Sequence, residues 1–66
     1  MYGQRIRELR IERGLTQAEL AQMLNITQKT ISKYENEFLD LNTNIIIACC
    51  EFFNVSSDYL LGISDI

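Results

Sequence analysis

Two helix-start signals, at Thr16 and Thr27, constrain the fold of this chain more than any other feature. Thr16 and Glu19 have the spacing of a capping box, in which the two side chains bond backbone amides that lack partners at a helix start. Asn25 stands where this first helix must end, because asparagine tolerates the left-handed backbone conformation better than most residues. Thr27 then caps a second helix. Residues 16–36 are therefore predicted to be two short helices joined by a tight turn, a helix-turn-helix.

The second of these helices presents different chemistry on its two sides. With Ile31 at the centre of the buried side, a period of 3.6 residues puts Tyr34 and Glu35 near it. The opposite side and its flanks carry Gln28, Lys29, Ser32, Lys33 and Asn36. These amide, hydroxyl and ammonium groups, with no carboxylate among them, suit the base edges of a DNA major groove. The same residues are common on solvated helix faces, so periodicity alone leaves a plain surface helix equally open.

The rest of the chain repeats the same kinds of start and stop signal. Further helices are predicted over about residues 2–13, 43–53 and 57–61, and their caps and stops are Gly14, Asn42, Asn54, Ser56 and Gly62. Proline is absent and glycine is rare, which favours helices over turns. The predicted fold class is therefore all-α, a compact five-helix bundle that forms a single domain over residues 1–66, with the helix-turn-helix at about residues 16–36.

The predicted helix over residues 43–53 is apolar around most of its circumference, which indicates burial on more than one side. Its core residues are expected to be Ile46, Cys49, Cys50 and Phe53. This helix and the connection before it carry more apolar surface than one small core needs, and soluble monomers avoid exposing such patches. The predicted contact between two copies comprises Leu39, Leu41, Ile45 and Phe52, with help from the region of Ser57. The alternative is that these residues cap the core of the monomer.

Composition argues against several classes of function. Cys49 and Cys50 are adjacent and can bond only through a strained link, so they are expected to be packing residues. Without histidine or a second cysteine pair, a metal site is not expected. No activated nucleophile or paired carboxylates are evident, so neither an enzyme nor a cofactor or small-molecule ligand is predicted. No apolar run reaches membrane-spanning length and no leader is visible, so a cytoplasmic protein is expected.

Charge is divided unevenly along the chain, whose net charge is −3. Residues 1–33 hold all six basic residues and three acidic ones, a net charge of +3. Residues 34–66 hold six acidic residues and no basic one, a net charge of −6. Because a polyanion responds to the local field and not to the average over the chain, the N-terminal half is the predicted side for a nucleic acid.

Arg10 is an exception among the charged residues of the first helix. Four of the others are expected to point outward: Arg5, Arg7, Glu8 and Glu12. Arg10 instead falls in the apolar sector beside Ile6, and a buried guanidinium needs a carboxylate partner. Glu35, on the inner side of the second motif helix, is the predicted partner. The alternative is that Arg10 reaches water along its own stem.

A resemblance to a known family rests on two segments, LTQAELAQMLNITQKTISKYEN and, after a further helix, FFNVSSDYLLG. They are similar to the DNA-binding domain of phage Cro and repressor proteins, a fold also described as the xenobiotic-response-element type. The resemblance covers about residues 4–62, which is nearly the whole chain. It implies a lambda-repressor-like fold whose partners are double-stranded DNA and a second copy of the same chain.

The resemblance assigns roles to individual residues. Gln17 matches a residue that holds a DNA phosphate, and Thr27 matches a cap that can also meet a phosphate or a thymine methyl group. The positions that touch base edges are matched by Gln28, Lys29 and Lys33. Asn36 matches a contact to the DNA backbone, and Ser32 lies on the flank of the same predicted face. These residues are the predicted DNA-binding site.

Two further parts of the chain bear on the resemblance. Arg10 and Glu35 match an internal ion pair of phage repressors, in agreement with the helical spacing. The connection after the second motif helix departs from the family. Glu37 stands where the family commonly has glycine, and basic or small polar residues near the phosphates are replaced by Phe38, Leu39 and Asp40. This replacement weakens the expected grip on the DNA backbone.

The predicted function is that of a dimeric, sequence-specific regulator of transcription, a repressor that places its third helix in the major groove. The alternative is a protein-interaction module of the same fold, such as an antitoxin or an antirepressor, which the acidic and apolar C-terminal half favours.

Overall fold

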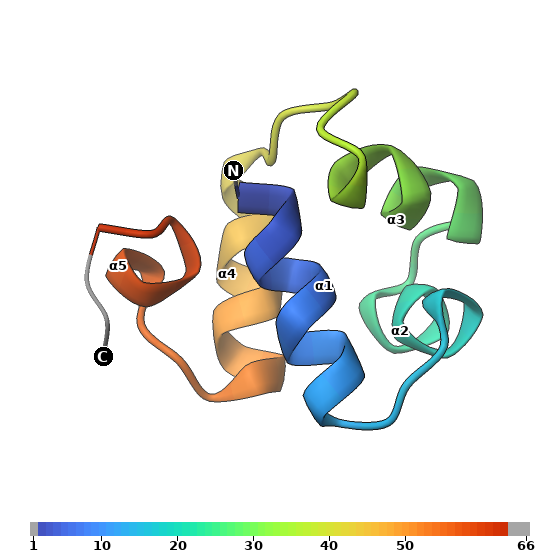
Figure 1. Ribbon diagram of the computed structural model, residues 1–66, viewed down its shortest axis with the longest axis horizontal. Coiled ribbons are helices and arrows are strands. Elements are labelled where there is room, and N and C mark those ends of the chain that lie inside the picture. The colour runs from blue at the N-terminus through green and yellow to red at the C-terminus, as the bar shows by residue number, and fades with distance from the viewer. Residues whose placement is uncertain (1, 64–66) are drawn as a thin grey trace.

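The computed structural model describes residues 2–63, which form five α-helices and no strand (Figure 1). The helices are α1 (Tyr2–Glu12), α2 (Gln17–Leu24), α3 (Gln28–Glu35), α4 (Thr43–Phe53) and α5 (Ser57–Leu60). The predicted all-α, five-helix fold class is thus confirmed. The helix-turn-helix consists of α2 and α3, and these two helices lie on one side of α1, with α5 on the other side (Figure 1).

The start and stop signals that the sequence predicted are present in the structure. The capping box is closed: Thr16 Oγ1 accepts from the Glu19 amide at 3.1 Å, and Glu19 Oε1 accepts from the Thr16 amide at 2.8 Å. The other predicted side-chain caps are Thr27, Asn42 and Ser56, and the predicted left-handed stops are Gly14, Asn25, Asn54 and Gly62. Each cap stabilises its helix by about 1 kcal/mol, so these local signals largely determine where the helices begin and end.

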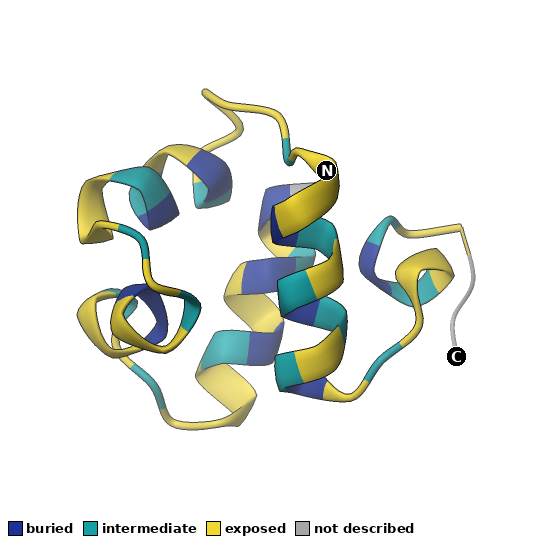
Figure 2. Cartoon of the chain, turned by 180° about the vertical axis from the view of Figure 1, so that it is seen from behind, coloured by how far each residue is buried: buried dark blue, intermediate teal, exposed yellow. Residues whose placement is uncertain are grey.

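All five helices contribute to one apolar core. Figure 2 marks the buried residues of the helices in dark blue. They are Ile6, Leu9, Leu20, Ala21, Ile31, Tyr34, Ile45, Cys49, Phe53 and Leu60. Each large apolar side chain removed from water contributes about 1.5–3 kcal/mol, so this cluster fixes how α3 sits on α1 and α2.

Helix α4 is rotated relative to the prediction. Its buried stripe consists of Ile45, Cys49 and Phe53, spaced four residues apart, and Ile45 is 8% exposed. The predicted core residues Ile46 and Cys50 are only partly buried, packed against the edge of the core. A helix that is apolar on nearly all sides has no polar face to set its rotation, so the packing of its neighbours decides which residues are innermost.

The two cysteines are free, as expected for packing residues. Cys49 lies in the core, where burial raises the pKa of its thiol to about 11. Burial also raises the pKa of the partly buried Cys50. Both thiols are therefore protonated and weakly nucleophilic near neutral pH. Separately, within residues 2–63, no helix combines the length and the apolar character needed to cross a bilayer.

Candidate nucleic-acid interface

Helix α3 turns a polar face to solvent and an apolar face to the core. Gln28, Lys29 and Lys33 are exposed, and Ser32 is half-buried on the flank of that face. Ile31 and Tyr34 are buried on the opposite side. The capped turn at Thr27 sets the start of the helix, and the burial of Ile31 sets its rotation. The exposed face therefore carries amide and ammonium groups, as the helical period predicted.

Arg10 and Glu35 are brought together between α1 and α3. The Arg10 Nε lies 2.7 Å from Glu35 Oε2, and the Arg10 Nη2 lies 3.1 Å from Glu35 Oε1, so the pair is bidentate. The remaining guanidinium nitrogen, Arg10 Nη1, donates to the Leu15 carbonyl oxygen at 2.8 Å. The two side chains are 13% and 3% exposed, respectively. The guanidinium thus joins α1, α3 and the turn before α2.

Gln17 extends this network toward the surface. Its Nε2 donates to Glu35 Oε1 at 3.2 Å, which holds the amide at the first turn of α2. A hollow of about 240 Å³ beside it, the polar crevice, is lined by Arg7, Arg10, Gln17, Glu35 and Asn36. Helix N-termini and arginine side chains both attract anions, so the crevice has the chemistry of a phosphate site.

Arg7 is the residue of this crevice that the sequence prediction missed. It was expected only to point outward, yet it lies beside Gln17 and Asn36. The signal was present in its spacing, since residues three apart on a helix share a face, and Arg10 had already been placed on the side that meets α3. Among the described residues, Arg7 makes no ion pair, so its charge is available to a ligand.

Two of the predicted DNA-binding residues make hydrogen bonds to residues of α3. The Asn36 Nδ2 donates to the Ser32 carbonyl oxygen at 2.8 Å and to Ser32 Oγ at 3.3 Å. Thr27 Oγ1 accepts from the Thr30 amide at 3.2 Å and shares a hydrogen bond with Thr30 Oγ1 at 2.9 Å. Both side chains are exposed, so a ligand can reach them, but Asn36 must turn away from Ser32 to donate elsewhere.

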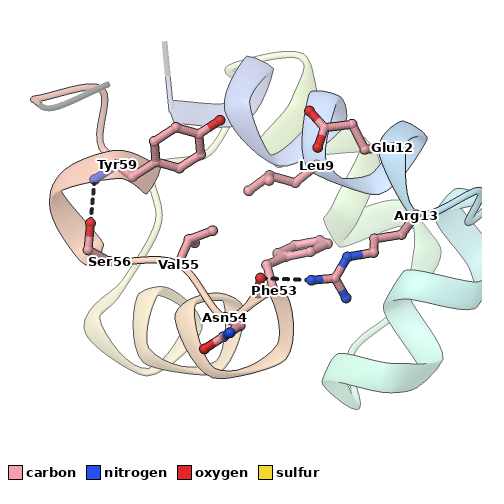
Figure 3. A pocket seen from close by; sticks show the side chains of 8 residues that line it. All are labelled: Leu9, Glu12, Arg13, Phe53, Asn54, Val55, Ser56 and Tyr59. Atoms are coloured by element: carbon pink, nitrogen blue, oxygen red, sulfur yellow. Dashed lines mark hydrogen bonds between the residues drawn. The ribbon is translucent and has the colours of Figure 1, made fainter. Parts of the chain in front are cut away.

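Two arginines of the basic half lie away from this face, contrary to what the charge division indicates. Arg5 was expected to point outward, but its guanidinium carbon lies 4.2 Å from the centroid of the Tyr59 ring in α5. Arg13 donates to the Phe53 carbonyl oxygen at 2.8 Å, at the end of α4 (Figure 3). Both arginines therefore place their positive charge against the C-terminal helices. These contacts join segments that are far apart in the sequence, so the sequence pattern does not reveal them.

Arg13 also borders a second hollow, of about 420 Å³, between α1, the end of α4 and α5. Its walls are largely apolar, with Leu9, Phe53 and Val55 inside and Glu12 at the rim (Figure 3). None of the predicted DNA-binding residues lines it. Over residues 2–63, no group of histidine, cysteine and acidic side chains is placed to hold a metal ion.

A helix-turn-helix with this outward polar face, flanked by an arginine-lined crevice, defines a DNA-binding domain of the helix-turn-helix class. Residues 6–60 match the helix-turn-helix family. The chain belongs to this family, in the Cro and phage-repressor branch of DNA-binding transcriptional regulators.

Individual relatives agree with this assignment. The transcriptional regulator ImmR of Bacillus subtilis (strain 168) is 42% identical over 60 residues, which are 91% of this chain and 47% of that protein. The antitoxin PezA of Streptococcus pneumoniae serotype 4 is 37% identical over 62 residues, 94% of this chain and 39% of that protein. The chain thus spans less than half the length of these two curated relatives.

Solved structures show the same fold. The P22 c2 repressor in complex with the synthetic operator 9T superposes with a TM-score of 0.84 at 30% identity, over 91% of each chain. The solution structure of the DNA-binding domain of that repressor gives a TM-score of 0.84 at 31% identity, over 92% of this chain and 80% of the other. The predicted lambda-repressor-like architecture is therefore confirmed.

Proposed function

We propose that this domain is a sequence-specific, double-stranded DNA-binding repressor of transcription that places α3 in the major groove as a homodimer. The observation that carries the proposal is the outward face of α3, with its exposed Gln28, Lys29 and Lys33 beside the polar crevice. The likeness to the P22 c2 repressor, solved on operator DNA, supports it.

In this proposal, residues on the exposed face of α3 contact the bases, and residues around the polar crevice contact the phosphates. Gln28 and Lys29, in the first turn of the helix, lie nearest the bases, where glutamine can grip adenine and lysine can donate to guanine. Lys33 continues the same face one turn later. Gln17 and Asn36 flank the crevice and serve the phosphates together with Arg7, while Thr27 and Ser32 border the face. Phosphate contacts would fix the register, and the base contacts would supply the specificity.

The proposed dimer follows from the small footprint of one helix. A single α3 covers only a few base pairs, and a two-fold pair doubles the contacts, with half-sites about 34–36 Å apart. The apolar contact is assigned to Leu39 and Leu41, with Phe38, 82% exposed, beside them. Of the other predicted contact residues, Phe52 keeps a partly exposed ring, whereas Ile45 has little surface outside the core.

The test begins with selection of binding sites from random DNA by the purified domain, followed by fluorescence anisotropy on the enriched sequence. Lys29→Ala should weaken binding to that site by about 1–3 kcal/mol and affect random DNA less. Arg7→Ala should weaken both equally and make the salt dependence shallower by about one unit of slope. No enriched sequence, or no loss in either variant, would contradict the proposal.

A role in protein binding is the second candidate, and the exposed Phe38 and Leu39 favour it, as does the similarity to an antitoxin. Exposed aromatic and aliphatic side chains on a polar surface are typical of protein contacts. This alternative predicts that Phe38→Ser abolishes capture of a partner protein while leaving DNA binding intact. A Phe38→Ser variant that still captures the same protein would count against it.

A further inference from the structure

The hollow between α1, the end of α4 and α5 has the size and the lining of a small-molecule site. Its volume of about 420 Å³ falls within the range of about 300–1,000 Å³ that such sites occupy. Leu9 and Phe53, 6% and 2% exposed, lie at its floor, and the half-buried Val55 and Tyr59 add further apolar surface. No small-molecule ligand was predicted from the sequence, because the hollow exists only once these three helices are assembled.

Two of the lining side chains are held in place by contacts within the protein. The Arg5 guanidinium carbon lies 4.2 Å from the centroid of the Tyr59 ring. Arg13 Nη2 donates to the Phe53 carbonyl oxygen at 2.8 Å, and the Arg13 guanidinium carbon lies 5.6 Å from the centroid of the Phe53 ring. Because these side chains are already ordered, a ligand that contacts them loses less affinity to side-chain ordering.

Two opposite charges, Glu12 and Arg13, border this apolar hollow. Figure 3 shows the Glu12 carboxylate on the α1 side and the Arg13 guanidinium reaching toward the end of α4. Within residues 2–63, neither side chain forms an ion pair. A guanidinium has five N–H groups, and Arg13 gives one of them to Phe53, so others are available. The hollow therefore offers an acceptor of cations and a donor to anions beside its apolar surface.

We propose that this hollow binds a small zwitterion with an apolar side chain, namely a free aromatic or aliphatic amino acid. The ammonium group of the ligand pairs with Glu12, its carboxylate accepts from Arg13, and its side chain lies against Val55 and Tyr59. A purely anionic ligand would meet Glu12 as a like charge, and a purely cationic one would meet Arg13, so a ligand with both charges fits best. The inference goes beyond DNA binding and does not depend on it.

The experiment titrates the isotope-labelled domain with L-phenylalanine and with L-leucine and follows the backbone amide signals by NMR. For ligands of this size we expect a Kd of about 0.1–5 mM, with saturable shifts centred on Leu9, Val55 and Tyr59. N-acetyl-L-phenylalanine lacks the ammonium charge, L-phenylalaninamide lacks the carboxylate, and each should bind at least about three-fold more weakly than L-phenylalanine. Glycine lacks the apolar side chain and should bind at least about ten-fold more weakly.

Single variants locate the two charges of the site. Glu12→Gln and Arg13→Gln should each weaken binding of L-phenylalanine by about three- to ten-fold. Glu12 is exposed and unpaired, so Glu12→Gln leaves the fold intact and keeps the test valid if Arg13→Gln is unstable. Glu51→Gln is the matched control, because this exposed carboxylate of α4 does not line the hollow and its loss should leave the affinity unchanged.

Three results would overturn the inference. The first is that neither amino acid gives saturable shifts at the hollow. The second is that the N-acetyl derivative, the amide or glycine binds as tightly as L-phenylalanine, which would remove the case for an apolar zwitterion. The third is that Glu12→Gln weakens binding no more than Glu51→Gln does. Selection of DNA sites by the same domain tests the proposed function separately, so failure of one proposal does not imply failure of the other.

Discussion

Separating Arg10 from Glu35 should destabilise the domain strongly, whereas replacing both together should cost little. The two side chains are 13% and 3% exposed and bond each other through two hydrogen bonds of 2.7 and 3.1 Å. In Glu35→Leu the guanidinium loses both of these bonds and keeps only the one to the Leu15 carbonyl oxygen. In Arg10→Met the more deeply buried carboxylate keeps only Gln17 as a donor.

The size of the effect follows from these exposures. Removing one member of a buried ion pair costs about 3–5 kcal/mol, because the remaining charge stays desolvated. A chain of 66 residues has a total stability of only about 3–10 kcal/mol, so each single variant should lose a large part of it. The corresponding fall in melting temperature is about 12 °C or more. The apolar double variant leaves no unpaired charge and should lose about 2 kcal/mol or less.

The assay is a double-mutant cycle that compares the wild type, the two single variants and the double variant. The free energy of unfolding of each protein is measured by urea titration, monitored by circular dichroism at about 15 °C, where stability is near its maximum. Glu8→Gln is the control, since Glu8 is half-exposed and lies 4.0 Å from Arg5 Nε, a pair expected to contribute under about 1 kcal/mol. The reasoning requires the two single losses to exceed the double loss by at least about 2 kcal/mol. Additive losses, or single losses no larger than that of Glu8→Gln, would refute it.

Three further outcomes are expected. Gly3→Ala should destabilise the domain by about 1–3 kcal/mol in urea unfolding, because its Cβ would meet the Tyr34 carbonyl oxygen, although alanine ordinarily favours a helix. The Cys49 thiol should resist alkylation at pH 8 until the protein unfolds, and stability should fall between about pH 9 and 11, where the unfolded thiol ionises and the folded one, with its raised pKa, does not. Leu39→Asp should convert a dimer into monomers in sedimentation; a wild-type monomer on DNA would contradict the proposed contact.

The features that the sequence predicted correctly depend on residues close together in the chain. Caps such as those at Thr16 and Thr27 bond amides three residues away, and the two faces of α3 follow from the helical period. The Arg10 and Glu35 contact joins two helices, but each residue was charged and placed on an apolar face, which left few possible partners. The caps, the two faces of α3 and the ion pair could therefore be predicted from residue type and helical spacing alone.

The features that the sequence did not reveal depend on how the helices pack. Nothing in the local pattern links Arg5 to Tyr59 or Arg13 to the end of α4, because the two partners are 54 residues apart in the first contact and 40 residues apart in the second. The burial of Ile45 in place of Ile46 depends on the rotation that the neighbours of α4 impose. The crevice around Arg7 likewise exists only once α1, α2 and α3 are assembled.

The use of Arg5 and Arg13 to hold the C-terminal helices has a consequence for how the protein would search a genome. Non-specific attraction to DNA grows with the number of cations that reach phosphates, and these two are held elsewhere. With few free cations on the α3 side, encounters with random sequence should be brief, and sliding along the duplex should be short. The domain would therefore find its target mainly by repeated dissociation and rebinding, and decoy sequences would sequester only a small fraction of its copies.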